Sequence, residues 1–180
     1  MTVSVSGSAT VKIVDNSKDF TDTRGHWSKD DVNFVAAREL FNGVGNNRFG
    51  VGESMTRGMV NTVLARLSGV DTTPESGLKW YEPGTAWAVS NGITDGTNLN
   101  GAVTREQLAA MLYRYAGSPE VSGTLSFEDA PTASGYAQDA LLWATKMGVL
   151  NGVGGNRLAP KDGASREQVA AMLARYLKNA

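Results

Sequence analysis

The sequence predicts a mainly α-helical fold made of three copies of one two-helix unit, preceded by a short N-terminal β segment. Two observations predict it. A Thr/Ser-Arg pair opens an amphipathic run three times, and two bulky residues seven positions apart precede each run. The 180-residue chain, 41% hydrophobic, has enough apolar material for one core shared by several small units. We place the copies at residues 20–70, 71–118 (shortened) and 119–180.

Residues 1–19 carry the only strand signal. Val3 and Val5, then Val11 and Ile13, alternate with polar residues around a Ser-Gly-Ser turn. This alternation is typical of a strand or hairpin, which we interpret as the tail of a preceding β domain.

The first helix of each copy is short. Its bulky residues lie two helical turns apart, so both fall on one face. The pairs are Trp27 and Phe34, Trp80 and Trp87, and Tyr136 and Trp143.

A glycine-bearing turn follows each short helix. Residues 41–49 of the first copy match residues 150–158 of the third without a gap, which places Gly43 opposite Gly152. The second copy has only the shorter stretch 92–99, with Gly96, and six positions from Leu99 to its helix arginine, which indicates a loop deletion. For each glycine alone, a positive-φ turn or helix C-cap is the favoured role.

The second helix of each copy opens with Arg57, Arg105 or Arg166. Apolar residues at offsets +3, +6, +7 and +10 from each arginine form one stripe, which predicts a helix with one buried face. TREQ and SREQ predict capping boxes, whereas Met59 breaks the motif in the first copy and predicts a weaker start. A second arginine recurs at +9, at the border of the stripe: Arg66, Arg114 and Arg175.

Composition excludes several function classes. A net charge of -1 gives no global field for nucleic acid or anionic membranes, and no apolar run is long enough to span a bilayer. With no cysteine and one histidine (His26), a thiolate site, a Ser-His-Asp triad or a multi-His metal site is not expected. Glu82, Asp95 and Glu106 form no predicted hydrolase pair, and Asp95-Gly96 lacks the rest of a calcium loop. We therefore predict no catalytic residue, metal or cofactor.

The order of motifs resembles the S-layer homology (SLH) module: Phe20-Thr21-Asp22 or Phe127-Glu128-Asp129, a Trp-containing short helix, a glycine turn, then T-R-E-Q. The resemblance covers residues 20–180 and implies three tandem modules around a central three-helix bundle of pseudo-threefold symmetry, with projecting prongs. It implies grooves that hold secondary cell-wall polysaccharide, often pyruvylated, and so anchor a surface protein without a covalent bond.

The resemblance also implies an extracellular location, in the cell wall or S-layer. On this interpretation the chain is a fragment without its signal peptide, a monomeric three-repeat unit attached to a larger surface protein. We expect it to bind no nucleic acid and to insert into no membrane. The alternative is a structural or self-assembly module that binds no saccharide.

The helix-start arginines are the principal candidate site. A cation in the first helical turn opposes the helix dipole at a cost of about 0.3–1 kcal/mol, yet the sequence places one there three times. Either Arg57, Arg105 and Arg166 clamp a ligand carboxylate, or they pair with Asp22 or Asp129 of an adjoining copy.

Aromatic residues and glycines complete the candidate site. Phe34, Trp87 and Trp143 suit the core, whereas the outer Trp27, Trp80 and Tyr136 suit either the core or stacking on sugar rings. Gly43, Gly96 and Gly152 would let the backbone approach a sugar, in addition to their turn role. Asp22 and Asp129 would cap a helix, pair with an arginine or accept a sugar hydroxyl, of which capping or pairing is favoured.

Overall fold

The computed structural model describes residues 15–179, so the predicted strand residues before position 15 lie outside the described part. The described chain is mainly α, as predicted, and its only β pairings are isolated bridges. The six α-helices are α1 (Lys29–Ala36), α2 (Arg57–Leu67), α3 (Glu82–Ser90), α4 (Arg105–Tyr115), α5 (Gln138–Lys146) and α6 (Arg166–Asn179). The 3-10 helices are η1 (Thr21–Thr23), η2 (Ala130–Thr132) and η3 (Gly135–Ala137).

The three longer helices α2, α4 and α6 begin at the arginines that the sequence indicates. Thr104 and Gln107 form a complete capping box, with Thr104 Oγ1 accepting from Gln107 N at 3.3 Å and Gln107 Oε1 accepting from Thr104 N at 3.1 Å. In the first copy Thr56 caps Met59 N at 3.3 Å, but Met59 has no oxygen to return the bond. These two helix starts therefore differ as predicted. The box predicted for the third copy is only half formed: Gln168 Oε1 accepts from Ser165 N at 3.4 Å, but the Ser165 hydroxyl donates to Glu167 Oε1 (2.6 Å).

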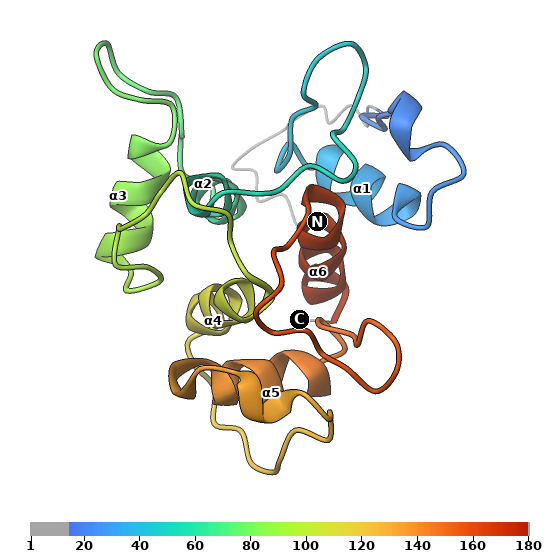
Figure 1. The fold of residues 1–180 in the computed structure, drawn as a ribbon. Helices are drawn as coiled ribbons and strands as arrows, with labels where there is room; N and C mark the ends of the chain where they lie inside the picture. The colour runs from blue at the N-terminus through green and yellow to red at the C-terminus, as the bar shows by residue number, and fades with distance from the viewer. Residues whose placement is uncertain (1–14, 180) are drawn as a thin grey trace, which may run out of the picture.

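Each short helix packs against the longer helix of another copy. In Figure 1, α3 lies beside α2, α5 beside α4 and α1 beside α6, while α2, α4 and α6 surround the middle of the molecule. Because the first copy's short helix rests on the third copy's longer helix, the chain closes on itself.

A ring of backbone hydrogen bonds joins the segments that precede the longer helices. Met55 N donates to Ala164 O (3.2 Å), Ala164 N to Val103 O (2.8 Å), and Val103 N to Met55 O (2.8 Å). All three residues are almost fully buried. The ring shows that the three copies meet in cyclic order, whereas pseudo-threefold symmetry of the helices stays a prediction.

The inner aromatic residues of the short helices face the core. Trp143 is buried and its ring centroid lies 5.7 Å from that of Tyr113. The ring centroids of Trp87 and Tyr115 are 6.3 Å apart. The guanidinium of Arg38 covers the Phe34 ring, with Cζ of Arg38 3.5 Å from the ring centroid. Within residues 15–179, no helix has the length and apolar character needed to cross a membrane.

The shortening of the second copy lies in the tip of its turn. A left-handed residue stands seven positions before each helix arginine: Gly50 (φ 91°), Asn98 (φ 48°) and Ala159 (φ 53°). The spacing after this point is therefore the same in all three copies, and the residues missing from the second copy precede Asn98. They correspond to the tips closed in the other copies by Val44 N to Arg48 O and Val153 N to Arg157 O, each 2.8 Å.

Candidate functional site

Two of the helix-start arginines reach into the turn of another copy and bind its carbonyl groups. Arg105 donates from Nε to Leu158 O (2.9 Å) and from Nη2 to Asn151 O (2.7 Å). Arg166 makes the equivalent bonds to Phe49 O (2.9 Å) and Asn42 O (2.8 Å). Both arginines are buried, and desolvation lowers the pKa of each guanidinium from its ordinary value.

The third arginine, Arg57, has a different partner. Its Nη2 donates to Asp95 Oδ1 at 2.6 Å and to Thr94 Oγ1 at 3.0 Å, and its buried Nε has no partner among the described residues. Asp95 also accepts from the amide and hydroxyl of Thr97, both at 3.0 Å. These bonds from Thr97, and then the charge of Arg57, lower the pKa of the Asp95 carboxyl. The short turn thus supplies a carboxylate where the longer turns supply carbonyls.

Asp22 and Asp129 hold the longer turns in shape. Asp22 accepts from the amides of Phe49 (2.7 Å), Gly50 (2.8 Å) and Val51 (3.0 Å), and Asp129 from two amides of the third copy's turn, each at 2.8 Å. Neither makes an ion pair with a helix-start arginine or a side-chain cap on a short helix. Their basic neighbours are the turn residues Arg48 (3.9 Å) and Arg157 (3.7 Å).

Gly43 and Gly152 are required by packing. A Cβ at Gly43 would lie 2.7 Å from Arg48 O and 2.8 Å from the Phe20 ring, and one at Gly152 would lie 2.9 Å from Arg157 O. Neither glycine is in the left-handed region, so the expected positive-φ role is wrong for these two, whereas Gly96 has φ +75° as expected. Phe20 therefore packs directly against Gly43, and Phe127 packs in the same way against Gly152.

A groove of about 310 Å³, which we name the Arg57 groove, lies between the second copy's turn, α4 and the approach to α5. Tyr136, more than half exposed, stands at its edge. The lining residues are Arg57, Ile93, Thr94, Asp95, Gln107, Ala110, Met111, Arg114 and Tyr136.

A second groove of about 280 Å³, the Arg166 groove, has the same plan between the first copy's turn, α2 and the approach to α3. Trp80, which is 48% exposed, takes the place of Tyr136, and Arg66 takes that of Arg114. The lining residues are residues 40–44, Met55, Met59, Thr62, Val63, Arg66, Trp80 and Arg166. An adjoining hollow of about 480 Å³ shares Phe41, Asn42, Gly43 and Arg66 with it.

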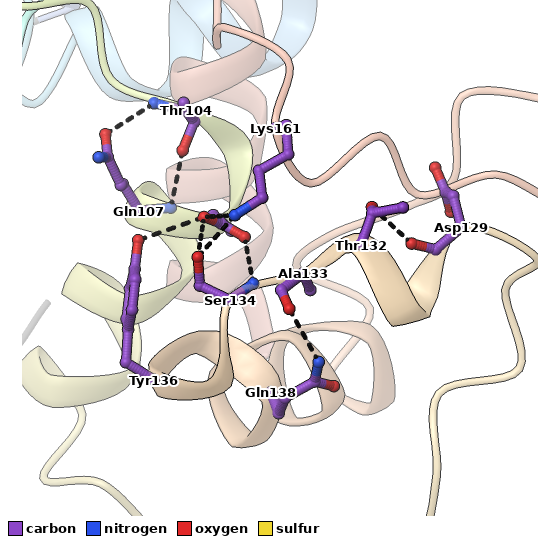
Figure 2. Close-up of polar contacts among 10 residues, drawn as sticks. Thr104, Gln107, Asp129, Thr132, Ala133, Ser134, Tyr136, Gln138 and Lys161 are labelled. Atoms are coloured by element: carbon purple, nitrogen blue, oxygen red, sulfur yellow. Dashed lines mark hydrogen bonds and ion pairs between the residues drawn. The ribbon is translucent and has the colours of Figure 1, made fainter.

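A buried carboxylate fixes the wall of the Arg57 groove. Glu106 accepts from Ser134 N and Oγ (2.9 Å each) and from Lys161 Nζ (2.7 Å), and the Tyr136 hydroxyl donates to it at 3.4 Å. Figure 2 shows Ser134 and Tyr136 of one segment and Lys161 of another directed toward this point. Although desolvation opposes the shift, the bonds from Lys161 and Ser134 lower the pKa of the Glu106 carboxyl.

Comparison with known proteins identifies the family of two segments of the chain. The S-layer homology domain model matches residues 19–58 and 126–170, which lie in the first and third copies. The chain contains S-layer homology domains. The second copy, which the model does not match, lacks the Phe-x-Asp triplet and the turn tip. That it is a third repeat of this domain stays a prediction.

Two curated relatives are enzymes in which this SLH region is a small part. An amylopullulanase of Thermoanaerobacterium thermosulfurigenes is 28% identical over 87% of the chain, which spans 9% of its length. Exoglucanase XynX of Acetivibrio thermocellus is 26% identical over 89% of the chain, which spans 16% of its length. A solved undecaheme cytochrome from the S-layer of Carboxydothermus ferrireducens is 25% identical, with a TM-score of 0.46 over 70% of this chain and 18% of that one. SLH domains in surface proteins serve cell-wall anchoring in general.

The SLH grooves contain some of the predicted site residues and omit others. Arg57, Arg166, Trp80, Tyr136 and Gly43 line a groove, and Gly96, Gly152, Arg105 and the exposed Trp27 line neither. Arg66 and Arg114 are predicted from the sequence only as border residues of the helix stripe, and the pattern around Asp95 was tested only against a calcium loop and a hydrolase pair. The sequence signal that could have identified Arg66 and Arg114 as groove residues is that an arginine recurs nine positions after each helix-start arginine. Residues 15–179 hold no group of three or more His, Asp or Glu side chains placed to bind a metal ion.

Proposed function

We propose that this chain anchors a surface protein to the bacterial cell wall by binding secondary cell-wall polysaccharide in its two grooves. The observation that carries the proposal is a shared arrangement. Each groove has a helix-start arginine, an arginine nine positions along a longer helix and an exposed aromatic ring. Two cations beside an aromatic wall suit a sugar that carries a carboxylate, such as a ketal-linked pyruvate.

The adjoining hollow supports a polymer as the ligand. Arg66 lines both this hollow and the Arg166 groove, and Lys18 also lines the hollow. A saccharide chain bound by its substituted unit beside Trp80 therefore has a path past Arg66. The proposed role is non-catalytic, and the attached protein supplies any enzymatic activity.

Sedimentation with cell-wall sacculi tests the proposal. We expect the protein to sediment with sacculi that retain the secondary polymer and to stay in the supernatant once the polymer is stripped. The double variant Trp80→Ala/Tyr136→Ala should lose most of the binding with an unchanged unfolding midpoint, because both rings are about half exposed. Val153→Ala, exposed on the third copy's turn and outside both grooves, is the control.

Arg105→Ala and Arg166→Ala are unsuitable binding tests, because both side chains hold buried carbonyl groups. Equal sedimentation with intact and stripped sacculi would contradict the proposal. Concentration-dependent assembly without sacculus binding would instead support a self-assembly module.

A further inference from the structure

The two grooves share a plan but differ in charge. The Arg166 groove is lined by two arginines, and none of the described residues that line it is acidic. The Arg57 groove is also lined by two arginines, but Asp95 lines it with them. The two grooves share the two arginines and the aromatic ring, and only the Arg57 groove adds a carboxylate to them.

The Arg166 guanidinium has hydrogen-bond partners, but no carboxylate next to it neutralises its charge. Its Nε and Nη2 donate to neutral carbonyls, and it forms no ion pair within 4.0 Å among the described residues. Glu53, Asp22 and Glu167 act on it only from further away. These carboxylates have other partners: Arg48 for Glu53 and Asp22, and Gly52 N and Ser165 Oγ for Glu167. A buried cation of this kind gains from an anion placed beside it.

Arg57 already holds such an anion. Asp95 lies 2.6 Å from its Nη2, and the two bonds from Thr97 keep the carboxylate in this orientation without any ligand. A ligand carboxylate in this groove would have to displace Asp95 or lie next to it, where the two negative charges repel each other. Arg114 alone remains without an ion pair among the lining residues that the structure describes.

We propose that Asp95 determines the specificity of these two sites. The Arg166 groove binds the carboxylate-bearing unit of the saccharide, and the Arg57 groove binds an uncharged unit because Asp95 occupies the place of the carboxylate. This inference rests on the proposed function and deepens it, since it assigns one ligand class to each groove.

Calorimetric titration with the methyl glycoside of pyruvylated N-acetylmannosamine tests the assignment. We expect one equivalent bound by the unaltered protein. Trp80→Ala should weaken this binding at least about tenfold, a loss of about 1.4 kcal/mol, and Tyr136→Ala should leave it unchanged. Asp95→Asn should add a second equivalent, because it removes the competing charge and keeps a side-chain oxygen for Thr97. Adding Tyr136→Ala to Asp95→Asn should remove that second equivalent.

Several outcomes would overturn the assignment. Two equivalents bound by the unaltered protein, or loss of binding on Tyr136→Ala but not on Trp80→Ala, would contradict it without any use of the Asp95 variant. So would a folded Asp95→Asn protein, verified by circular dichroism, that still binds one equivalent. If the protein sediments with intact sacculi while these titrations fail, the groove assignment is wrong and the anchoring function stands. If it binds neither sacculi nor the glycoside, the proposed function itself fails.

Discussion

The first copy's turn and the second copy's turn perform the same task in different ways. Each receives a helix-start arginine from another copy, Arg166 in the first case and Arg57 in the second. The longer turn offers two carbonyls and encloses the guanidinium, whereas the shorter turn offers Asp95 and leaves Nε without a partner among the described residues. The comparison shows how a change in loop length converts a structural arginine with uncompensated charge into a neutralised one.

The largest expected effect tests this difference in stability. Arg166→Ala leaves the buried carbonyl of Phe49 and the partly buried carbonyl of Asn42 without their donor, so it should lower the free energy of unfolding by about 3 kcal/mol. Arg57→Ala should cost only about 1 kcal/mol, because its Asp95 partner is largely exposed and can be hydrated. Urea unfolding of the two variants measures both values. Equal losses would show that the two turns hold their arginines equally firmly.

The longer turns should also be sensitive to a single methyl group. Gly43→Ala places a carbon 2.7 Å from Arg48 O and 2.8 Å from the Phe20 ring, which we expect to destabilise the fold by about 2 kcal/mol. Gly152→Ala should cost less, since the matching approaches are 2.9 and 3.1 Å. Thermal unfolding compares the two variants.

Gly135→Ala is the matched control for these variants. Its Cβ would meet nothing within 4 Å and its φ is not left-handed, so its unfolding midpoint should barely move. A midpoint for Gly43→Ala that equals the control's would contradict the close packing of phenylalanine and turn.

Asp22 and Asp129 of the longer turns, which have no counterpart in the second copy, predict a dependence of stability on pH. Desolvation raises the pKa of Asp22, but amide bonds from Phe49, Val51 and Gly50 outweigh it and lower that pKa. At Asp129 the bond from Leu158 N is the largest cause of a lowered pKa. A pKa that is lower in the folded state gives stability that is complete above the unfolded value, about 3.9, and is lost as the pH falls through the folded value.

Acid unfolding of Asp22→Asn and Asp129→Asn measures this contribution. Each variant should be less stable than the parent near neutral pH, and the difference should shrink as the pH falls below about 4. Asp71→Asn is the comparison: the bond from Thr73 N (2.8 Å) also lowers the pKa of this exposed carboxyl, so it should lose stability with the same sign but by less than either turn variant. A difference that stays constant between neutral pH and pH 3 would show that the charge is not what stabilises the turn.

The sequence predicted the helices better than it predicted the site. Local signals mark the start of each longer helix at Arg57, Arg105 and Arg166, and the seven-residue spacing correctly placed Phe34, Trp87 and Trp143 toward the core. The partner of each arginine is not a local property. It depends on which copy's turn lies opposite, and this follows from the cyclic closure of the chain through Met55, Val103 and Ala164.

The position of the loop deletion was missed for a related reason. The sequence indicates a deletion from the short stretch 92–99 and the six positions from Leu99 to Arg105, without placing it within the turn. The backbone aligns Asn98 with Gly50 and Ala159, three residues of different chemistry that share a left-handed φ. A conformation common to asparagine, glycine and alanine leaves little trace in residue type, so the role of Asp95 could not be deduced from the pattern alone.

The smallest expected effect concerns the helix starts beside the two grooves. Gln107 completes a capping box in the second copy, and Met59 occupies the same place in the first. Gln107→Met should therefore destabilise the protein by about 0.5 kcal/mol, since Thr104 N loses its side-chain partner while Thr104 Oγ1 still caps the helix. Met59→Gln should recover part of the same amount in the first copy, less the apolar contact that Met59 makes with the core. Urea unfolding of Gln107→Met, of Met59→Gln and of the variant with both substitutions, under the same conditions, measures the change in the free energy of unfolding that each one causes. If Gln107→Met costs nothing, the helix starts are held by the ring of backbone bonds rather than by their caps.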